Sequence, residues 1–168
     1  MPTFQVEVTE PDFYIFIKIS AHLTGFSEEE LLGTGMHETY YYTVMKEQDQ
    51  ETVRSFFRKA EEIMIGNTRI REGIIQHFIP RSEKKPLPTP PLDTLPYAGL
   101  AKRIILLWYT GIWTTMNWKD KKTERERTAM VSPQAYVQSL IWAAAETHPA
   151  GAKQPGYNSW NRQPILKE

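Results

Sequence analysis

Hydrophobic side chains recur every three to four residues along most of this chain, which is the spacing of one face of an α-helix. Outside 4–8, no alternation typical of a strand extends over more than five residues. Short turns separate the first four stretches and favour antiparallel neighbours. The pattern therefore predicts an all-α fold, a compact bundle of about six helices in a single domain over 1–168. These helices are expected over 12–23, 27–44, 51–66, 70–78, 97–109 and 132–144.

Local signals mark several of the helix ends. Ser27 and Glu30 have the spacing of a capping box, in which each side chain accepts a hydrogen bond from the other residue's backbone amide. Ser132 followed by Pro133 is typical of an N-cap with proline at the first helical position. Glycine is common just past a helix end, so Gly111 is expected to end the fifth helix.

Each predicted helix carries an apolar stripe that should face the core. Gly25 closes the first helix. Gly33 and Gly35 lie inside the second stripe, and each weakens that helix by about 1 kcal/mol relative to alanine. The expected core residues are Phe13, Phe16, Ile17, Leu23, Leu31, Leu32, Met36, Tyr40, Val44, Val53, Phe56, Phe57, Ala60, Ile63, Met64, Leu100, Ile104, Leu107, Tyr136, Leu140, Ala143 and Ala144.

Three stretches lack a clear helical period. Six prolines fall within 80–96 and predict an extended crossover, because proline fixes φ and removes a backbone donor. The tail over 149–168 is expected to be irregular and wrapped on the surface, held there by Tyr157 and Trp160. The charged run over 119–127 is expected to be a solvated loop or helix end.

Composition narrows the chemistry that this chain can carry. The 168 residues have a formal net charge of +0 and include no cysteine, which excludes disulfides, thiol catalysis and cysteine-ligated metals. No apolar run approaches the roughly 20 residues of a membrane span, so we predict no direct membrane insertion. Acidic residues interrupt the basic run, so we also predict no nucleic-acid partner.

The charge is unevenly distributed along the chain. Residues 1–62 carry 12 acidic and 5 basic side chains, a net charge of −7, and 63–168 carry the compensating +7. Such an asymmetry can orient a docking partner. The first ten residues have neither a basic segment nor an apolar segment of the kind that export machinery reads, so we expect a cytoplasmic protein. A periplasmic location is the alternative if the chain is mature or is exported with its partner.

No catalytic or metal-binding pattern emerges from the polar residues. The 33–35 stretch begins like a dinucleotide fingerprint, but it lacks the third glycine and the preceding strand. None of the histidines has a second histidine or a glutamate at helical spacing, so no metal site, catalytic residue or cofactor is predicted in this chain. The histidines are His22, His37, His77 and His148.

Aromatic residues gather in two places that catalysis does not explain. Three of the five tryptophans lie over 108–118, and the tail contains Tyr157 and Trp160 within a proline- and glycine-containing segment. Large amphipathic rings are favoured at protein interfaces as well as in cores. We interpret both clusters as a partner-binding surface, with packing of the tail onto the bundle as the alternative.

Several short segments, taken together and in order, resemble a known family. They lie at 16–25, 107–111, 131–136, 140–142 and 155–164. The combination resembles the small subunit of bacterial flavin-dependent sugar and alcohol dehydrogenase complexes, of the sorbitol, fructose and glucose dehydrogenase type.

That resemblance implies a chain without an active site of its own. It implies a chaperone and partner for a large FAD-binding oxidoreductase of the glucose–methanol–choline type, with FAD held by that partner, and it leaves open a cytochrome c subunit as a second partner. Aromatic anchors and a glycine that permits close approach are the residue types such contacts use. The expected contact residues are Thr24, Trp108, Tyr109, Thr110, Gly111, Trp113, Tyr157 and Trp160.

Two other functions stay open from the sequence. One is a stand-alone helical adaptor for another partner. The other is a small enzyme that uses His37 or His77 as a base near the tyrosines at 40–42.

Overall fold

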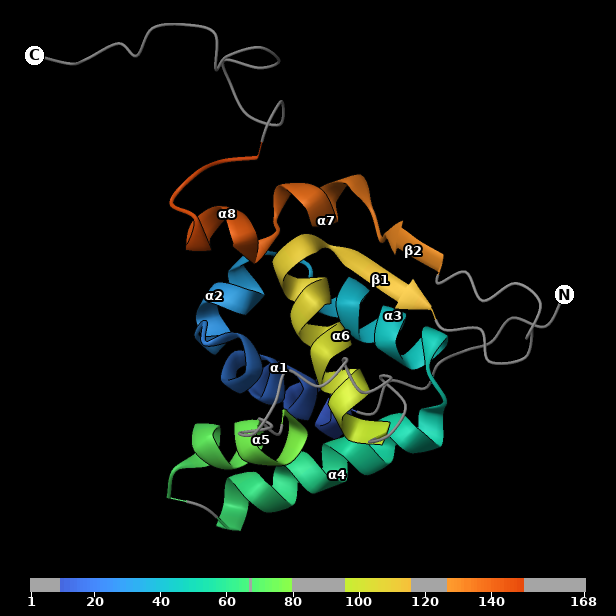
Figure 1. The fold of residues 1–168 in the computed structure, drawn as a ribbon, viewed down its shortest axis with the longest axis vertical. Helices are drawn as coiled ribbons and strands as arrows, with labels where there is room; N and C mark the ends of the chain where they lie inside the picture. Colours follow the sequence, from blue (N-terminus) through green and yellow to red (C-terminus); the bar gives the residue numbers. More distant parts are fainter. Residues whose placement is uncertain (1–9, 67, 80–95, 116–126, 150–168) are drawn as a thin grey trace, which may run out of the picture.

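The computed structural model describes residues 10–66, 68–79, 96–115 and 127–149. Within these ranges the chain forms eight helices and one pair of antiparallel strands (Figure 1), which confirms the predicted all-α class. The elements are α1 (Glu10–Thr24), α2 (Glu28–Gly33), α3 (His37–Glu47), α4 (Gln50–Gly66), α5 (Ile70–Phe78), α6 (Pro96–Thr110), β1 (Ile112–Thr115), β2 (Arg127–Met130), α7 (Pro133–Val137) and α8 (Leu140–Ala144).

Two helices, α1 and α6, form the centre of the core. Figure 1 shows α4 and α5 at one end of the molecule and α7 and α8 at the other, with α1 and α6 between them. Helix α1 packs against α2, α3, α4, α5 and α6, so it is the element on which most of the bundle is built. Side chains that are fully buried come from all of these helices. They include Phe16, Ile19, Leu31, Tyr40, Tyr41, Phe56, Phe57, Ile74, Leu100, Ile104, Leu107 and Trp108.

The helix predicted over 27–44 is in fact two helices, α2 and α3. The predicted capping box is present, since the Ser27 hydroxyl accepts from the Glu30 amide at 3.2 Å and the Glu30 carboxylate accepts from the Ser27 amide at 2.8 Å. The break comes at Gly35, whose φ of +68° is a left-handed conformation that ends a helix. Because the stripe does not continue through this turn, Leu32 is 43% exposed, and its assignment to the core was wrong.

The helix predicted from Ser132 to 144 is also divided. Its start is as predicted, with the Ser132 hydroxyl accepting from the Ala135 amide at 3.0 Å and proline in the first turn. Ser139 then interrupts the helix, because its ψ of 132° is not helical, and its hydroxyl donates to the Ala135 carbonyl at 2.7 Å. The second piece, α8, is fixed to the first by the Trp142 indole, which donates to the Tyr136 carbonyl at 2.7 Å.

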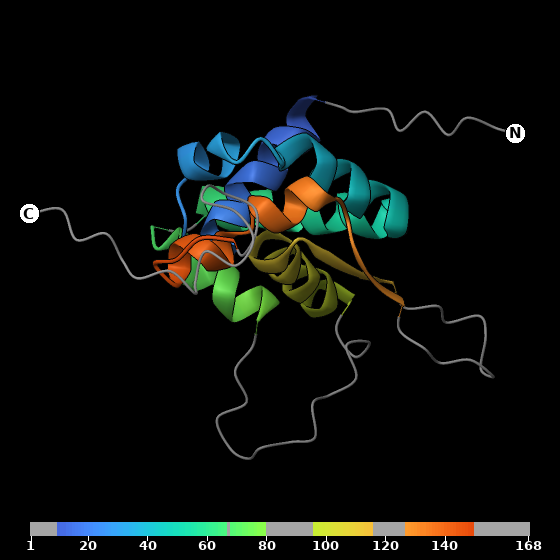
Figure 2. The ribbon, with the colours of Figure 1, turned by 90° about the horizontal axis from the view of Figure 1, so that it is seen from above.

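The short sheet was not predicted. Strands β1 and β2 pair antiparallel with Ile112 opposite Met130 and Thr114 opposite Thr128, and they lie beside α3 (Figure 2). A strand of four residues is too short for its alternation to stand out in the sequence, and the pairing depends on contact between distant segments.

Several sequence predictions lie outside the described residues. These are the crossover apart from Pro96, the charged run at 119–126 and the tail over 150–168, with Tyr157 and Trp160. Pro96 itself is the first residue of α6.

Candidate partner-binding surface

The corner between α6 and β1 brings together segments that are far apart in the sequence. Gly111 has a φ of +70°, and a side chain there would lie 2.7 Å from the carbonyl carbon and oxygen of Ala135 on α7. The Val131 amide donates to the Gly111 carbonyl at 2.9 Å. Glycine is required at this position both for its backbone conformation and for the close approach of α7.

The end of α1 meets the same corner. The Tyr109 hydroxyl donates to the Thr24 carbonyl at 3.0 Å, and the rings of Tyr109 and Phe26 are 6.1 Å apart in an edge-to-face arrangement. The Thr24 hydroxyl is turned back into its own helix, where it donates to the Ser20 carbonyl at 2.8 Å. Thr24 and Tyr109 therefore join α1 to α6.

Two of the predicted contact residues are buried in the core of the chain itself. Trp108 is 1% exposed, and its ring lies 4.8 Å from that of Tyr40 and 6.2 Å from that of Phe16. Trp113 is 4% exposed. The Trp108 indole is therefore not available for a direct partner contact in this conformation, because the rings of Tyr40 and Phe16 pack against it. Trp113 has only a small exposed area.

Of the remaining predicted contact residues, the structure describes Thr110 but not Tyr157 and Trp160. The Thr110 hydroxyl donates to the Leu106 carbonyl at 2.7 Å and accepts from the Ile112 amide at 3.3 Å, so this side chain shapes the end of α6. Tyr157 and Trp160 lie outside the described residues, and their partner contacts stay predictions.

The structure adds a groove between α3 and the sheet that the sequence did not indicate. It has a volume of about 490 Å³, and Tyr42 and Met130 stand at its surface with 45% and 41% of their area exposed. The signal that could have identified Tyr42 is the run of three tyrosines at 40–42, since successive helical residues point about 100° apart and cannot all face one core. The groove is lined by Thr39, Tyr42, Thr43, Lys46, Glu47, Trp113, Ala129, Met130 and Val131.

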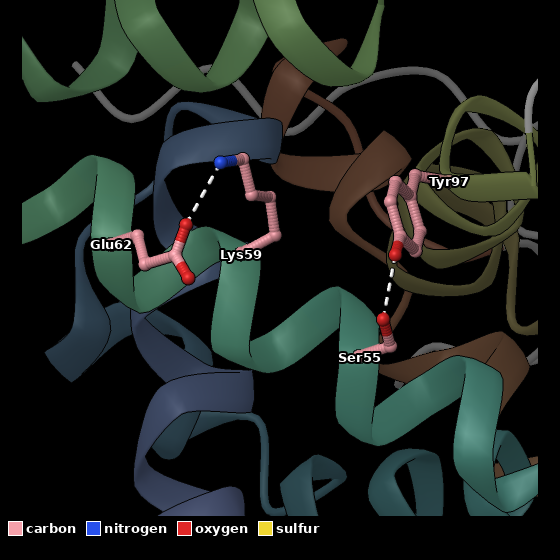
Figure 3. Close-up of polar contacts among 4 residues, drawn as sticks. All are labelled: Ser55, Lys59, Glu62 and Tyr97. Atoms are coloured by element: carbon pink, nitrogen blue, oxygen red, sulfur yellow. Dashed lines mark hydrogen bonds and ion pairs between the residues drawn. The ribbon is translucent and has the colours of Figure 1, made fainter.

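A second hollow, of about 620 Å³, lies where the start of α4 meets α6. Its lining is mostly polar, with acidic and basic side chains both present. The hydroxyls of Ser55 and Tyr97 are 2.6 Å apart and connect the two helices, and one turn further along α4 Lys59 and Glu62 form an exposed ion pair at 2.8 Å (Figure 3). An exposed pair of this kind contributes little to stability.

The histidines weighed as catalytic bases lie against aromatic rings. The ring of His37 is 5.8 Å from that of Phe13, and the ring of His77 is 4.9 Å from that of Phe78. Burial lowers the pKa of His22, an effect that nearby Arg71 reinforces and Glu28 opposes. Within the described ranges, no three His, Asp or Glu side chains are grouped so that they could hold a metal ion.

Buried tyrosines make the stability of this core sensitive to alkaline pH. Burial raises the pKa of Tyr40 and of Tyr41 above the ordinary value near 10. The unfolded chain therefore loses these protons first. The two tyrosines should leave stability unchanged below pH 10 and lower it above that pH, by up to about 1.4 kcal/mol per pH unit for each group. Urea unfolding between pH 8 and 11 tests this, and Tyr40→Phe should reduce the slope. An unchanged slope in that variant would contradict the assignment.

Comparisons with known proteins leave the family of the chain open. In the part of the chain that the structure describes, no helix has the length and apolar character needed to cross a bilayer. No protein-family model, no curated protein and no solved structure matches this chain.

Proposed function

We propose that this chain is a small, non-catalytic subunit that binds and stabilises a large FAD-dependent oxidoreductase of the glucose–methanol–choline type, acting on a sugar or an alcohol. FAD belongs to the large partner. The observation that carries the proposal is the groove between α3 and the sheet, where apolar and aromatic side chains are exposed beside the segments that resemble the family.

The resembling segments support the proposal because they are neighbours in space. Residues from 16–25, 107–111 and 131–136 meet at the α6–β1 corner through the hydrogen bonds of Tyr109 and Gly111. Motifs that build one junction are expected to occur together in a sequence. The junction also holds β1 and β2 against the bundle, and these strands form one wall of the groove.

The composition of the groove supports a protein partner. An exposed tyrosine and an exposed methionine lie next to lysine and threonine side chains, which resembles the apolar centre and polar rim of a protein interface. Tyrosine is among the residues that most often dominate binding energy at such interfaces.

Co-expression with a large FAD-dependent oxidoreductase of the glucose–methanol–choline type tests the proposal. We expect the two proteins to elute together in gel filtration. When this chain is omitted, the yield of soluble, flavin-loaded oxidoreductase should fall.

Tyr42→Ala should weaken the complex at least tenfold, which corresponds to about 1.4 kcal/mol of binding free energy. Tyr14→Ala removes a tyrosine that is 57% exposed on α1, outside the groove, and is the matched control. Separate elution with an equally soluble, flavin-loaded enzyme would overturn the proposal and favour an adaptor for another partner.

A further inference from the structure

We propose that an extended segment of the partner pairs with the free edge of β2 as a third strand of the sheet. This inference rests on the proposed function and specifies how the partner is held. The occupant is a strand that carries small or apolar side chains toward the groove and an acidic side chain within reach of Lys46.

The register of the sheet shows which backbone groups of β2 are free. Gly111 and Val131 are hydrogen-bonded, and in an antiparallel pair such positions alternate with positions whose amides point outward. Ala129 is therefore bonded to Trp113, whereas the amides and carbonyls of Thr128 and Met130 face away from β1. Among the described residues, neither the Thr128 amide nor the Met130 amide donates to a backbone carbonyl outside the sheet.

Apart from its short length and Arg127 at its start, the described part of β2 has none of the devices that usually protect an exposed strand. Natural edges are commonly blocked by charged side chains, by proline, by bulges or by a covering element. The described side chains Thr128, Ala129 and Met130 are neutral and exposed, and the register with β1 is regular. An edge with neutral side chains and outward amides can be a template for an incoming extended backbone.

The groove would receive alternate side chains of the added strand. A residue of the added strand that pairs with Ala129 would point to the same face of the sheet as Ala129 and Trp113. Both of these residues line the groove. The groove is lined by two charged side chains of α3, Lys46 and Glu47. Lys46 is exposed and forms no ion pair with another described residue, whereas Glu47 is half-buried, so Lys46 is the more accessible charge. An acidic side chain on the incoming strand would complement this charge, whereas a basic one would be disfavoured.

Residue-resolved amide hydrogen exchange of the ¹⁵N-labelled full chain, free and bound to the co-expressed flavoprotein, tests the pairing. In the free chain the Thr128 and Met130 amides should exchange at least tenfold faster than the Ala129 amide, since only Ala129 donates to β1. In the complex, both outward amides should slow at least tenfold, and Ala129 should change little.

Two substitutions give an independent measurement of affinity. Met130→Pro removes an outward donor without touching the bonds to β1, and it should raise the Kd about tenfold, whereas Met130→Leu keeps the amide and should leave the Kd within twofold. Lys46→Glu should raise the Kd about fivefold, and Lys102→Glu, the same charge change on α6, should not. If Met130→Pro does not fold, Thr128→Pro removes the other outward donor.

The outcomes separate the pairing from the proposed function. If the flavoprotein is not retained at all, both are overturned. If it is retained while the Thr128 and Met130 amides exchange as fast as in the free chain, only the strand pairing is overturned. Slow exchange of these amides in the free chain would also overturn it. If the slowing of exchange in the free chain increases with protein concentration, the occupant of the edge is a second copy of this chain. If the slowing does not depend on concentration, the occupant is another part of the same chain.

Discussion

Trp108→Ala is expected to lower the free energy of unfolding of the isolated chain by about 3–5 kcal/mol. The indole is 1% exposed and lies between the rings of Phe16 and Tyr40, so truncation would leave a cavity where α1, α3 and α6 meet. Since small domains are stable by only about 5–15 kcal/mol, this loss would be a large fraction of the total stability. Urea denaturation followed by circular dichroism measures the loss.

The choice of replacement distinguishes packing from partner binding. Trp108→Phe keeps most of the ring volume and removes an indole N–H that has no hydrogen-bond partner within the described residues, so its cost should be well below that of alanine. A Trp108→Ala chain that is as stable as the parent but no longer retains the flavoprotein would contradict the buried role and restore Trp108 as a contact residue.

Gly111→Ala is expected to cost about 3 kcal/mol, through two separate effects. A φ of +70° is unfavourable for alanine by about 1–2 kcal/mol, and the new Cβ would lie 2.7 Å from the backbone of Ala135, which can move only if α7 moves. Gly35→Ala is the matched control, because Gly35 has nearly the same φ of +68° and nothing within 4 Å of the added atom. It should cost about 1–2 kcal/mol.

The difference between the two glycine variants measures the contact with α7. Thermal or urea unfolding of both proteins gives that difference directly. Equal costs at the two positions would mean that α7 shifts without penalty, and the corner would then not be the rigid junction described here.

The helices were largely predictable because their signals are local. The capping box at Ser27 and Glu30, and the N-cap at Ser132, need only residues three positions apart, and both are present as predicted. Helix α5 begins and ends at the predicted residues, since its period and its boundaries lie within nine residues. The weak points in the second predicted helix were visible as glycines, but the conformation of Gly35 was not.

The candidate site was predicted less well. The sequence identified the residues from Trp108 to Trp113 as unusual, and they do occupy a junction of the fold, but it did not distinguish a ring packed inside from one presented outside. Both interpretations favour the same residue types. Tyr42 and Met130 were missed because a single exposed apolar side chain is common on any protein surface.

The sequence by itself determined the helical class, most helix ends and the majority of the buried residues, because periodicity and capping act over one or two turns of chain. Only the tertiary structure decided that Trp108 faces the core, that α7 contacts the backbone at Gly111, and that β1 and β2 pair beside α3 to form a groove. Each of these depends on segments about 15 to 90 residues apart, and the free energy of such contacts comes from the packing of the whole core.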